Sequence, residues 1–417
     1  MNCTSTMKMT KKADGEIEVT ICYTHYGHTK DVEHIRLPKT KREEIAAKLQ
    51  QGVKHEKIID DTRNSIDPMS IKRCDLLDKQ DIRNIESSFG LKEVIRHDNN
   101  QESVLSWIKE WELLDENPVI FYKMQGEESK DDVPLEKEDF IIIVQTPMQK
   151  MMLQKFGPKR VCIDSTRGTT AYDFLLTSIL VVDDFGSGYP VAWCLANHDD
   201  TTTMTVFFNE IKKKCGVITP LWLMSDVANQ FFNAWVGVME NRPIKLLCTW
   251  HVDRAWRENL RQKIGDLYAE SETYKLVRYA LEQTDIELFK NQLAKMLVIF
   301  QGNSKTEQFH QYFKHEWVPR QKEWAYCHRL GLGINTNMFV ESFHRVFKHV
   351  YLKGKCNKRV DACLVNLLKF ARDKFFERLI KITKGKQSTR LKTINDRHNR
   401  GLKLSSDLVH QHSDSQW

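Results

Sequence analysis

Three short apolar runs follow one another in the middle of the chain, between residues 160 and 197. They read RVCIDST, FLLTSILVVDD and YPVAWCLAN, and the turn-forming stretches RGTTAYD and FGSG separate them. Valine, isoleucine and aromatic residues favour extended backbone, whereas glycine, aspartate and serine favour tight turns. The pattern therefore predicts three antiparallel strands joined by short connections.

Helical and strand patterns alternate in the stretch that follows. DDTTTMTVFFNEIKKKCG opens with capping residues and carries apolar residues at helical spacing, and ANQFFNAWVGVME and HVDRAWRENLRQKIG are also helical in pattern. Between them, LWLMSD and IKLLCTW have the length and composition of buried strands. The predicted order βββαβαβα is typical of the ribonuclease H-like fold, so we expect an α/β protein built on such a core.

The flanking regions are mostly helical in pattern. Residues 39–64 carry two short apolar stripes broken at Gln51 and Gly52, which is typical of a helix-turn-helix; a two-helix packing unit without a ligand is the alternative. The expected organisation is a strand-and-loop segment at 1–37, a helical DNA-binding region at 38–125, an acidic linker at 126–139, the ribonuclease H-like core at 140–353 with an all-helical insertion at about 252–330, and a basic helical tail at 354–417.

Composition narrows the class of protein. The chain has 417 residues, of which 41% are hydrophobic, enough to bury a sizeable core. No apolar run approaches 18 residues, so we expect no membrane partner. The ten cysteines are scattered without a CxxC pair, which favours reduced thiols and an intracellular protein over a disulfide framework.

Positive charge is concentrated at the end of the chain. The net charge is +7, but residues 342–417 alone carry 18 Lys and Arg against 6 Asp and Glu. This asymmetry favours a polyanion such as nucleic acid, although a solvated basic helix face would have the same composition. The residues that we expect to contact DNA are Lys39, Lys41, Arg42, Lys48, Lys54, Arg345 and Lys348.

Two aspartates end predicted strands that should be neighbours. Asp164 ends the first strand and Asp226 ends the fourth, and these two strands lie side by side in a ribonuclease H-like sheet. Glu341, on the polar side of the helical stretch NMFVESFHRVFKHVYLK, is the candidate for a third carboxylate. Clustered carboxylates repel unless cations neutralise them, so the trio predicts a site for two Mg²⁺ or Mn²⁺ ions. A turn aspartate and a solvated helix glutamate are the ordinary alternatives.

Cysteine and histidine occur at ligand spacing in two places. Cys248 and His251 follow the fifth strand as CTWH and could support the carboxylate site, but two ligands do not make a zinc site. Cys22, His25 and His28 lie within seven positions, which would be a possible zinc site that lacks a fourth ligand; a bare hairpin is the alternative.

Four segments together resemble the transposase domain of Mutator-like elements: VCIDSTRGTT, LMSDVANQFFNAW, LLCTWHVDRAW and NMFVESFHRVFK. The resemblance covers about residues 158–353. It implies that Asp164, Asp226 and Glu341 form the Asp-Asp-Glu metal-binding triad and that Cys248 and His251 are the CxxH motif of that family. The segment around THYGH is similar to the tail of a zinc-finger module, whereas no CxCxnCxH pattern follows Glu341.

The resemblance implies a transposase that cleaves DNA at element ends and joins the 3′-hydroxyl to target DNA. It further implies DNA as the partner, a nuclear location and a homo-oligomer. One alternative is a domesticated, catalytically silent descendant that regulates transcription by binding DNA. Another is a ribonuclease H-like nuclease that cuts but does not join.

Overall fold

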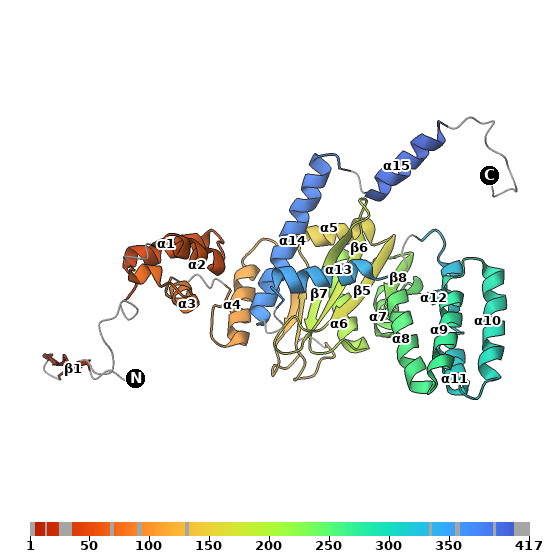
Figure 1. The fold of residues 1–417 in the computed structure, drawn as a ribbon, viewed down its shortest axis with the longest axis horizontal. Helices are drawn as coiled ribbons and strands as arrows, with labels where there is room; N and C mark the ends of the chain where they lie inside the picture. The colour runs from red at the N-terminus through yellow and green to blue at the C-terminus, as the bar shows by residue number, and fades with distance from the viewer. Residues whose placement is uncertain are drawn as a thin grey trace. The chain divides into compact units, whose positions relative to one another are not determined.

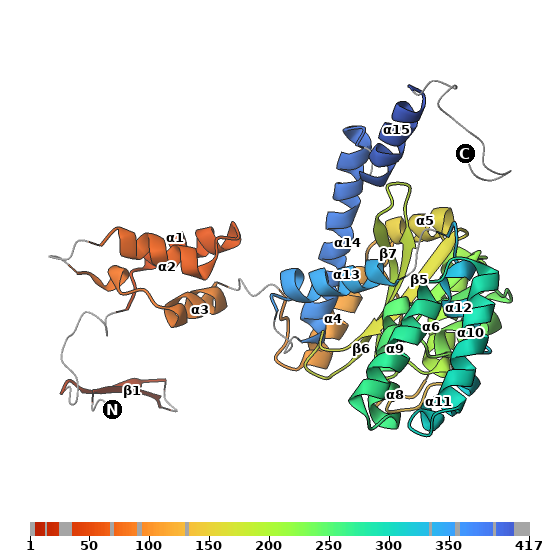
Figure 2. The same cartoon turned by 45° about the vertical axis from the view of Figure 1, so that its right-hand side comes forward.

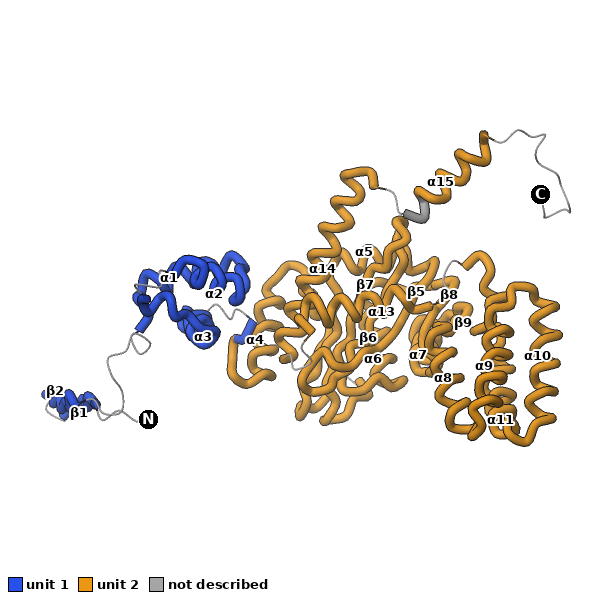
Figure 3. The backbone as a smooth tube through the Cα atoms, in the orientation of Figure 1, with its two compact units in different colours: residues 1–95 blue, residues 96–417 orange. Residues whose placement is uncertain are grey.

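The structure is a computed structural model of the chain, and it describes residues 5–12, 15–24, 36–66, 71–89, 94–129, 133–332, 336–354, 359–386 and 389–403. The chain divides into two compact units, residues 1–95 and 96–417 (Figure 3). Among the helices of the described ranges, none has both the length and the apolar character that crossing a bilayer requires.

The first unit contains a hairpin and a small helical cluster. Strand β1 (Thr6–Lys11) pairs antiparallel with β2 (Ile17–Cys22). The cluster consists of α1 (Lys39–Gln50), α2 (His55–Asn64), η2 (Arg73–Asp75) and α3 (Lys79–Ser88). Its core joins Ile45 of α1, Ile58 of α2 and Ile82 of α3. The two helices predicted in residues 39–64 are present, and they turn at Gly52, whose φ of +81° suits glycine.

A seven-stranded mixed sheet organises the second unit in its described part (Figure 1). The order across the sheet is β3-β4-β7-β6-β5-β8-β9. Only the pairs β5/β8 and β8/β9 are parallel. The strands are β3 (Val119–Lys123), β4 (Ile141–Val144), β5 (Arg160–Thr166), β6 (Leu175–Val182), β7 (Gly188–Ala196), β8 (Trp222–Ser225) and β9 (Ile244–Leu247). The last five are the strands that the sequence predicts, in the predicted order, with β5 and β8 adjacent.

One strand and one connection lie where the sequence pattern indicated other structure. Strand β3 falls inside the stretch 38–125 that was expected to be helical, and residues 126–139, expected to be a linker, join β3 to β4 within one sheet. Lys123 ties this connection to the strand pair, because its Nζ donates hydrogen bonds to the carbonyls of Lys137 and Asp139. The second unit therefore begins at residue 96, before α4 (Asn100–Glu112).

Helices cover both faces of the sheet. Alternate strand residues such as Val161 and Ile163 share one apolar core with α5 (Pro147–Phe156), α6 (Thr201–Cys215) and α7 (Gln230–Met239). Cys162, between them, points into the other core, which α4, α13 (Met338–Val346), η4 (Phe347–Tyr351) and α14 (Val360–Thr383) complete. Figures 1 and 2 show α13 lying across the strands of the sheet.

The predicted all-helical insertion follows β9. It comprises α8 (Thr249–Lys263), α9 (Leu267–Glu282), α10 (Ile286–Gln301), α11 (Glu307–Glu316), α12 (Gln321–Trp324) and η3 (Tyr326–His328). These helices have an apolar core of their own, centred on Trp256, whose ring contacts those of Phe313, Trp317 and Trp324. Phe313 and Trp317, like Trp256, are therefore core residues, as the periodicity indicates.

The tail contains two helices. The 24-residue α14 packs on the sheet, and α15 (Thr389–Gly401) follows it. Arg378 of α14 is buried and donates hydrogen bonds to Asp183 and Asp184 in the turn between β6 and β7. A buried charged group therefore connects the end of α14 to the sheet.

Candidate active site

The two predicted aspartates belong to neighbouring parts of the sheet, because β5 and β8 pair in parallel. In this parallel pair Arg160 lies opposite Trp222 and Cys162 opposite Met224. The parallel pairing ends there: Asp164 lies two positions further along β5, which continues to Thr166 and so does not end at Asp164 as the sequence pattern predicted, and Asp226 directly follows β8. The charge of Asp226 raises the pKa of Asp164, so the two carboxyl groups lie close enough to interact.

Helix α13 carries Glu341 to the same end of the sheet. Asn337, at its N-terminus, donates a hydrogen bond from Nδ2 to the carbonyl of Ile163 at 3.0 Å, one residue before Asp164. One turn after Glu341, His344 Nε2 lies 3.1 Å from Ser178 Oγ, and Ser178 is the partner of Asp164 across β5 and β6. The helix is therefore fixed to the strands on both sides of Asp164.

The surroundings of Asp164 disfavour the charged form of its carboxyl group. The residue is 7% exposed, and burial raises the pKa of its carboxyl to about 8; the charges of Asp226 and Glu341 act in the same direction. Burial also raises the pKa of Asp226 to about 6, although the Ala228 amide, Lys245 and Arg320 oppose this shift. Burial raises the pKa of Glu341 as well. Such clustering of perturbed carboxyl groups is typical of a functional site.

His344 and Asn337 are site residues that the sequence analysis did not find. His344 Nδ1 lies 3.9 Å from Asp164 Oδ2, but burial lowers the pKa of the imidazole to about 3, so it carries no positive charge at neutral pH. Its position three residues after Glu341 puts it on a neighbouring part of the same helix surface, which is the one sequence signal for it.

Cys248 and His251 lie beside Glu341. Cys248 is fully buried at the N-cap of α8, and its Sγ is 3.7 Å from Glu341 Oε1. The backbone amide of Asn337 donates to the same sulfur at 3.2 Å. Among the described residues, ligand atoms of Cys248, His251 and Glu341 all lie within 4.8 Å of one another. Glu341 is therefore grouped with the CxxH pair in this structure.

The possible zinc site in the first unit is described only in part. Cys22 is an exposed free thiol at the end of β2, and His25 and His28 lie outside the described residues.

The basic residues predicted to contact DNA occupy two surfaces. Lys39, Lys41, Arg42 and Lys48 are on α1, and Lys54 is the exposed residue before α2. Lys41 and Lys48 both form ion pairs with Glu44, and Arg42 donates to Ser88 Oγ. On the second surface, Arg345 is exposed, and Lys348 Nζ donates to Thr166 Oγ1 at the end of β5.

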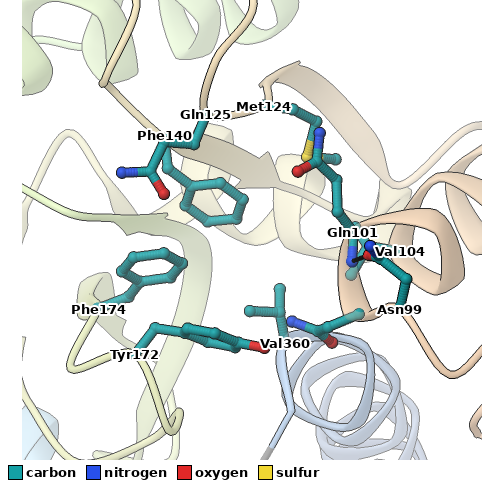
Figure 4. A pocket seen from close by; sticks show the side chains of 10 residues that line it. Asn99, Gln101, Val104, Met124, Gln125, Phe140, Tyr172, Phe174 and Val360 are labelled. Atoms are coloured by element: carbon teal, nitrogen blue, oxygen red, sulfur yellow. Dashed lines mark hydrogen bonds between the residues drawn. The ribbon is translucent and has the colours of Figure 1, made fainter.

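A separate cavity of about 290 Å³ lies among α4, β3 and the start of α14 (Figure 4). The rings of Phe140 and Phe174 stack beside it at 4.4 Å, and Tyr172 continues the stack. None of the acidic, cysteine or histidine residues discussed above lines this cavity.

The buried carboxyl of Asp164 leads to a prediction about stability. A carboxyl whose pKa is raised on folding costs stability as the pH rises from its unfolded pKa of about 4 to its folded pKa. In chelator, we expect Asp164→Asn to raise the free energy of unfolding of the second unit by about 1–3 kcal/mol at pH 8 relative to wild type, with a smaller gain at pH 5. All ten tryptophans follow residue 106, so their fluorescence during urea unfolding reports on this unit.

The matched control is Asp173→Asn, which changes an exposed aspartate whose ion pair is with Arg167. We expect that variant to unfold within about 0.5 kcal/mol of wild type at both pH values. If Asp164→Asn raises the free energy of unfolding by the same amount at both pH values, the negative charge of Asp164 is not the cause of the destabilisation.

The sheet order and the helices on both faces define a ribonuclease H-like α/β fold, a fold associated with nucleic acids. A family model described as the RNaseH-like domain of zinc finger SWIM domain-containing protein 1/3 matches residues 128–222. The matched segment contains Asp164 and ends before Asp226 and Glu341. A search of curated proteins found no match.

Proposed function

We propose that the chain is a metal-dependent DNA-cleaving enzyme of the Asp-Asp-Glu type, a transposase related to Mutator-like elements. The observation that carries the proposal is that β5 and β8, which lead to Asp164 and Asp226, are parallel neighbours, and that the charge of Asp226 raises the pKa of Asp164. Burial is the main cause of the raised pKa of Asp164, and the charges of Asp226 and Glu341 add to it, as neighbouring carboxyl groups do.

The residues at this site fit Mg²⁺ or Mn²⁺. Carboxylate oxygens are the ligands that these cations prefer. Asp164 is held within β5, and Asp226 directly follows β8. Asp164 and Asp226 would hold one ion, and Asp164 and Glu341 the second. When bound, the pair of ions supplies Lewis acidity to the attacking and leaving oxygens of an in-line displacement at phosphorus.

Other residues of the chain would position DNA. Arg345 is exposed on α13 and Lys348 lies at the end of β5, so both could hold phosphates close to Asp164. Lys39 and Lys54 extend from the helical cluster of the first unit and would add contacts that do not depend on the catalytic site. We infer a nuclear location and a homo-oligomer from the same resemblance to transposases.

One observation favours a second function. Glu341 lies against the Cys248 thiol. If Glu341 contacts Cys248 and not the metal ions, the triad is incomplete, as in a protein that binds DNA without cutting it. In this alternative the chain is a domesticated DNA-binding regulator of transcription. The family-model match to an RNaseH-like domain supports the fold and does not support transposition in particular.

The test uses the full chain with supercoiled plasmid that carries candidate element ends, in the presence of Mg²⁺ or Mn²⁺. Products in which the ends are joined to new DNA support the transposase. Nicked or linear plasmid without joined products indicates a nuclease that cuts only. Retardation of the plasmid without any cleavage, at every metal concentration, overturns catalysis and supports the DNA-binding alternative.

The first-unit lysines give a prediction about affinity. Each phosphate contact that is lost lowers the slope of log affinity against log salt by about 0.9. We expect Lys39→Ala combined with Lys54→Ala to weaken DNA binding and to reduce that slope by about 2, measured by fluorescence anisotropy between 50 and 200 mM salt.

The matched control is the pair Lys275→Ala and Lys290→Ala, two exposed lysines of the helical insertion. Equal losses in the two double variants would show that net charge, and not the α1 and α2 surface, determines binding.

A further inference from the structure

The group formed by Cys248, His251 and Glu341 has the composition of a transition-metal site. A thiolate and an imidazole are soft or intermediate ligands, which select Zn²⁺ and similar ions over Mg²⁺. Three protein ligands with one open position are a common arrangement for zinc. The three residues come from the end of β9, the first turn of α8 and α13, so the fold and not a single motif brings them together.

The distances agree with tetrahedral coordination. Zinc bonds of about 2.3 Å to sulfur and about 2.0 Å to oxygen place those two ligand atoms about 3.5 Å apart in a tetrahedron. Cys248 Sγ and Glu341 Oε1 are 3.7 Å apart. All three ligand atoms lie within 4.8 Å of one another, so small side-chain movements would complete the site.

The surroundings of the cluster also suit a metal. Burial raises the pKa of the Cys248 thiol, but the hydrogen bond that the Asn337 amide donates to Sγ and the position of the sulfur at the N-terminus of α8 oppose this and favour a thiolate ligand. Within the described structure, Nδ1 of His251 is buried and lacks a hydrogen-bond partner. A buried polar atom without a partner is costly, and coordination or an outer contact to a bound ligand would satisfy it.

We propose that Cys248, His251 and Glu341 bind a zinc-class transition-metal ion, in a site distinct from the two-carboxylate position at Asp164 and Asp226. Binding forms bonds from the metal to sulfur, nitrogen and oxygen, and it releases the thiol proton of Cys248 to solvent. Glu341 is the one residue that both sites would use. A metal held by the Cys248 group would therefore fix the glutamate that the proposed cleavage site needs.

The experiment measures metal binding by the full chain without DNA. The protein is stripped with a chelator and titrated with Co²⁺, whose charge-transfer absorption near the ultraviolet reports a bond to thiolate. Bound Zn²⁺ is then counted per chain after competition. We expect a thiolate band in wild type, its loss in Cys248→Ser, and Zn²⁺ binding at least about 100-fold weaker in that variant.

Two variants make the result specific. Cys22→Ser removes the exposed thiol of the first unit and should keep the band, because that cysteine is outside the group. Asp164→Asn should also keep the band, since this aspartate belongs to the other site. Retention of the band in Cys248→Ser, its loss in Cys22→Ser, or no band in wild type would each overturn the proposal.

Cys248 is fully buried, so Cys248→Ser is checked for folding by circular dichroism. If that variant fails to fold, His251→Gln, at a partly exposed histidine, provides the test instead. A shifted Co²⁺ thiolate band with weaker Zn²⁺ binding supports the site, and unchanged Zn²⁺ binding overturns it. Zinc binding is measured without DNA, so its result does not depend on whether the chain cleaves DNA. Loss of Zn²⁺ binding with cleavage intact, or the reverse, separates the two proposals.

Discussion

Replacing Asp226 with asparagine should reduce metal-dependent plasmid cleavage by at least about a thousandfold, equivalent to about 4 kcal/mol of transition-state stabilisation. The reason is that a neutral amide cannot share a divalent cation with Asp164. The local fold should survive, because the asparagine Oδ1 can still accept the hydrogen bond that the Ala228 amide donates to Asp226 at 3.1 Å. The measurement is the rate of loss of supercoiled plasmid at saturating Mg²⁺ or Mn²⁺.

DNA affinity in chelator separates chemistry from binding. We expect Asp226→Asn to bind DNA as tightly as wild type or slightly more tightly, since a negative charge near the phosphates is removed. Asp173→Asn, which changes an aspartate in a turn, should cleave at the wild-type rate. Cleavage that persists in Asp226→Asn would show that the catalytic site has been assigned to the wrong residues.

The second large effect is expected at Arg378. This side chain is 7% exposed, and its Nη1 lies 2.8 Å from Asp183 Oδ2 and 2.7 Å from Asp184 Oδ1. Removing one partner of a buried ion pair leaves the other charge without compensation, which costs about 3–5 kcal/mol. We therefore expect Arg378→Met to lower the free energy of unfolding of the second unit by about that amount, measured by urea unfolding with tryptophan fluorescence.

The same helix provides the control. Arg372 of α14 is mostly exposed and pairs with the adjacent Asp373, so Arg372→Met should change stability by less than about 1 kcal/mol. Adding Asp183→Asn to Arg378→Met should recover part of the lost stability, because it removes the buried negative charge. No recovery would indicate that the loss comes from packing of the arginine side chain and not from the unpaired aspartate.

Local sequence patterns were sufficient for five neighbouring strands of the sheet. Strands β5 to β9 have continuous apolar runs between clear turn signals, so their order and the adjacency of β5 and β8 could be predicted. Strands β3 and β4 could not, because β4 joins the sheet through β7, some fifty residues later in the chain. Such distant pairing leaves no local signal, and the acidic run between β3 and β4 has the composition of a linker.

The helix that carries Glu341 shows a second limit of periodicity. In a regular α-helix, spacing of three and four residues would put Val350 on the same face as Phe343 and Phe347, yet Val350 is 65% exposed. The backbone widens to a π-helix over Phe347–Tyr351, and one wide turn changes the phase of all residues that follow. The site residues before that turn are unaffected, which is why the position of Glu341 could be predicted while the end of the helix could not.

His344 was missed for a different reason. Its one sequence signal is the three-residue spacing from Glu341, and that spacing alone does not separate a buried core histidine from a site residue. Only the contact with Ser178, which belongs to β6, and the short distance to Asp164 identify its place. The partner of Glu341 likewise depends on tertiary contacts, because Cys248 is 93 positions away.

The helical block α8 to α12 leaves the sheet at Cys248 and returns at Asn337, and these two residues touch through the 3.2 Å hydrogen bond from the Asn337 amide to Cys248 Sγ. Its exit and entry points are thus already joined, and its apolar core is its own. Segments with neighbouring ends can be exchanged or shortened with little strain on their host. The block can accordingly act as an interchangeable module, whose size is free to diverge while the strands on either side keep their geometry.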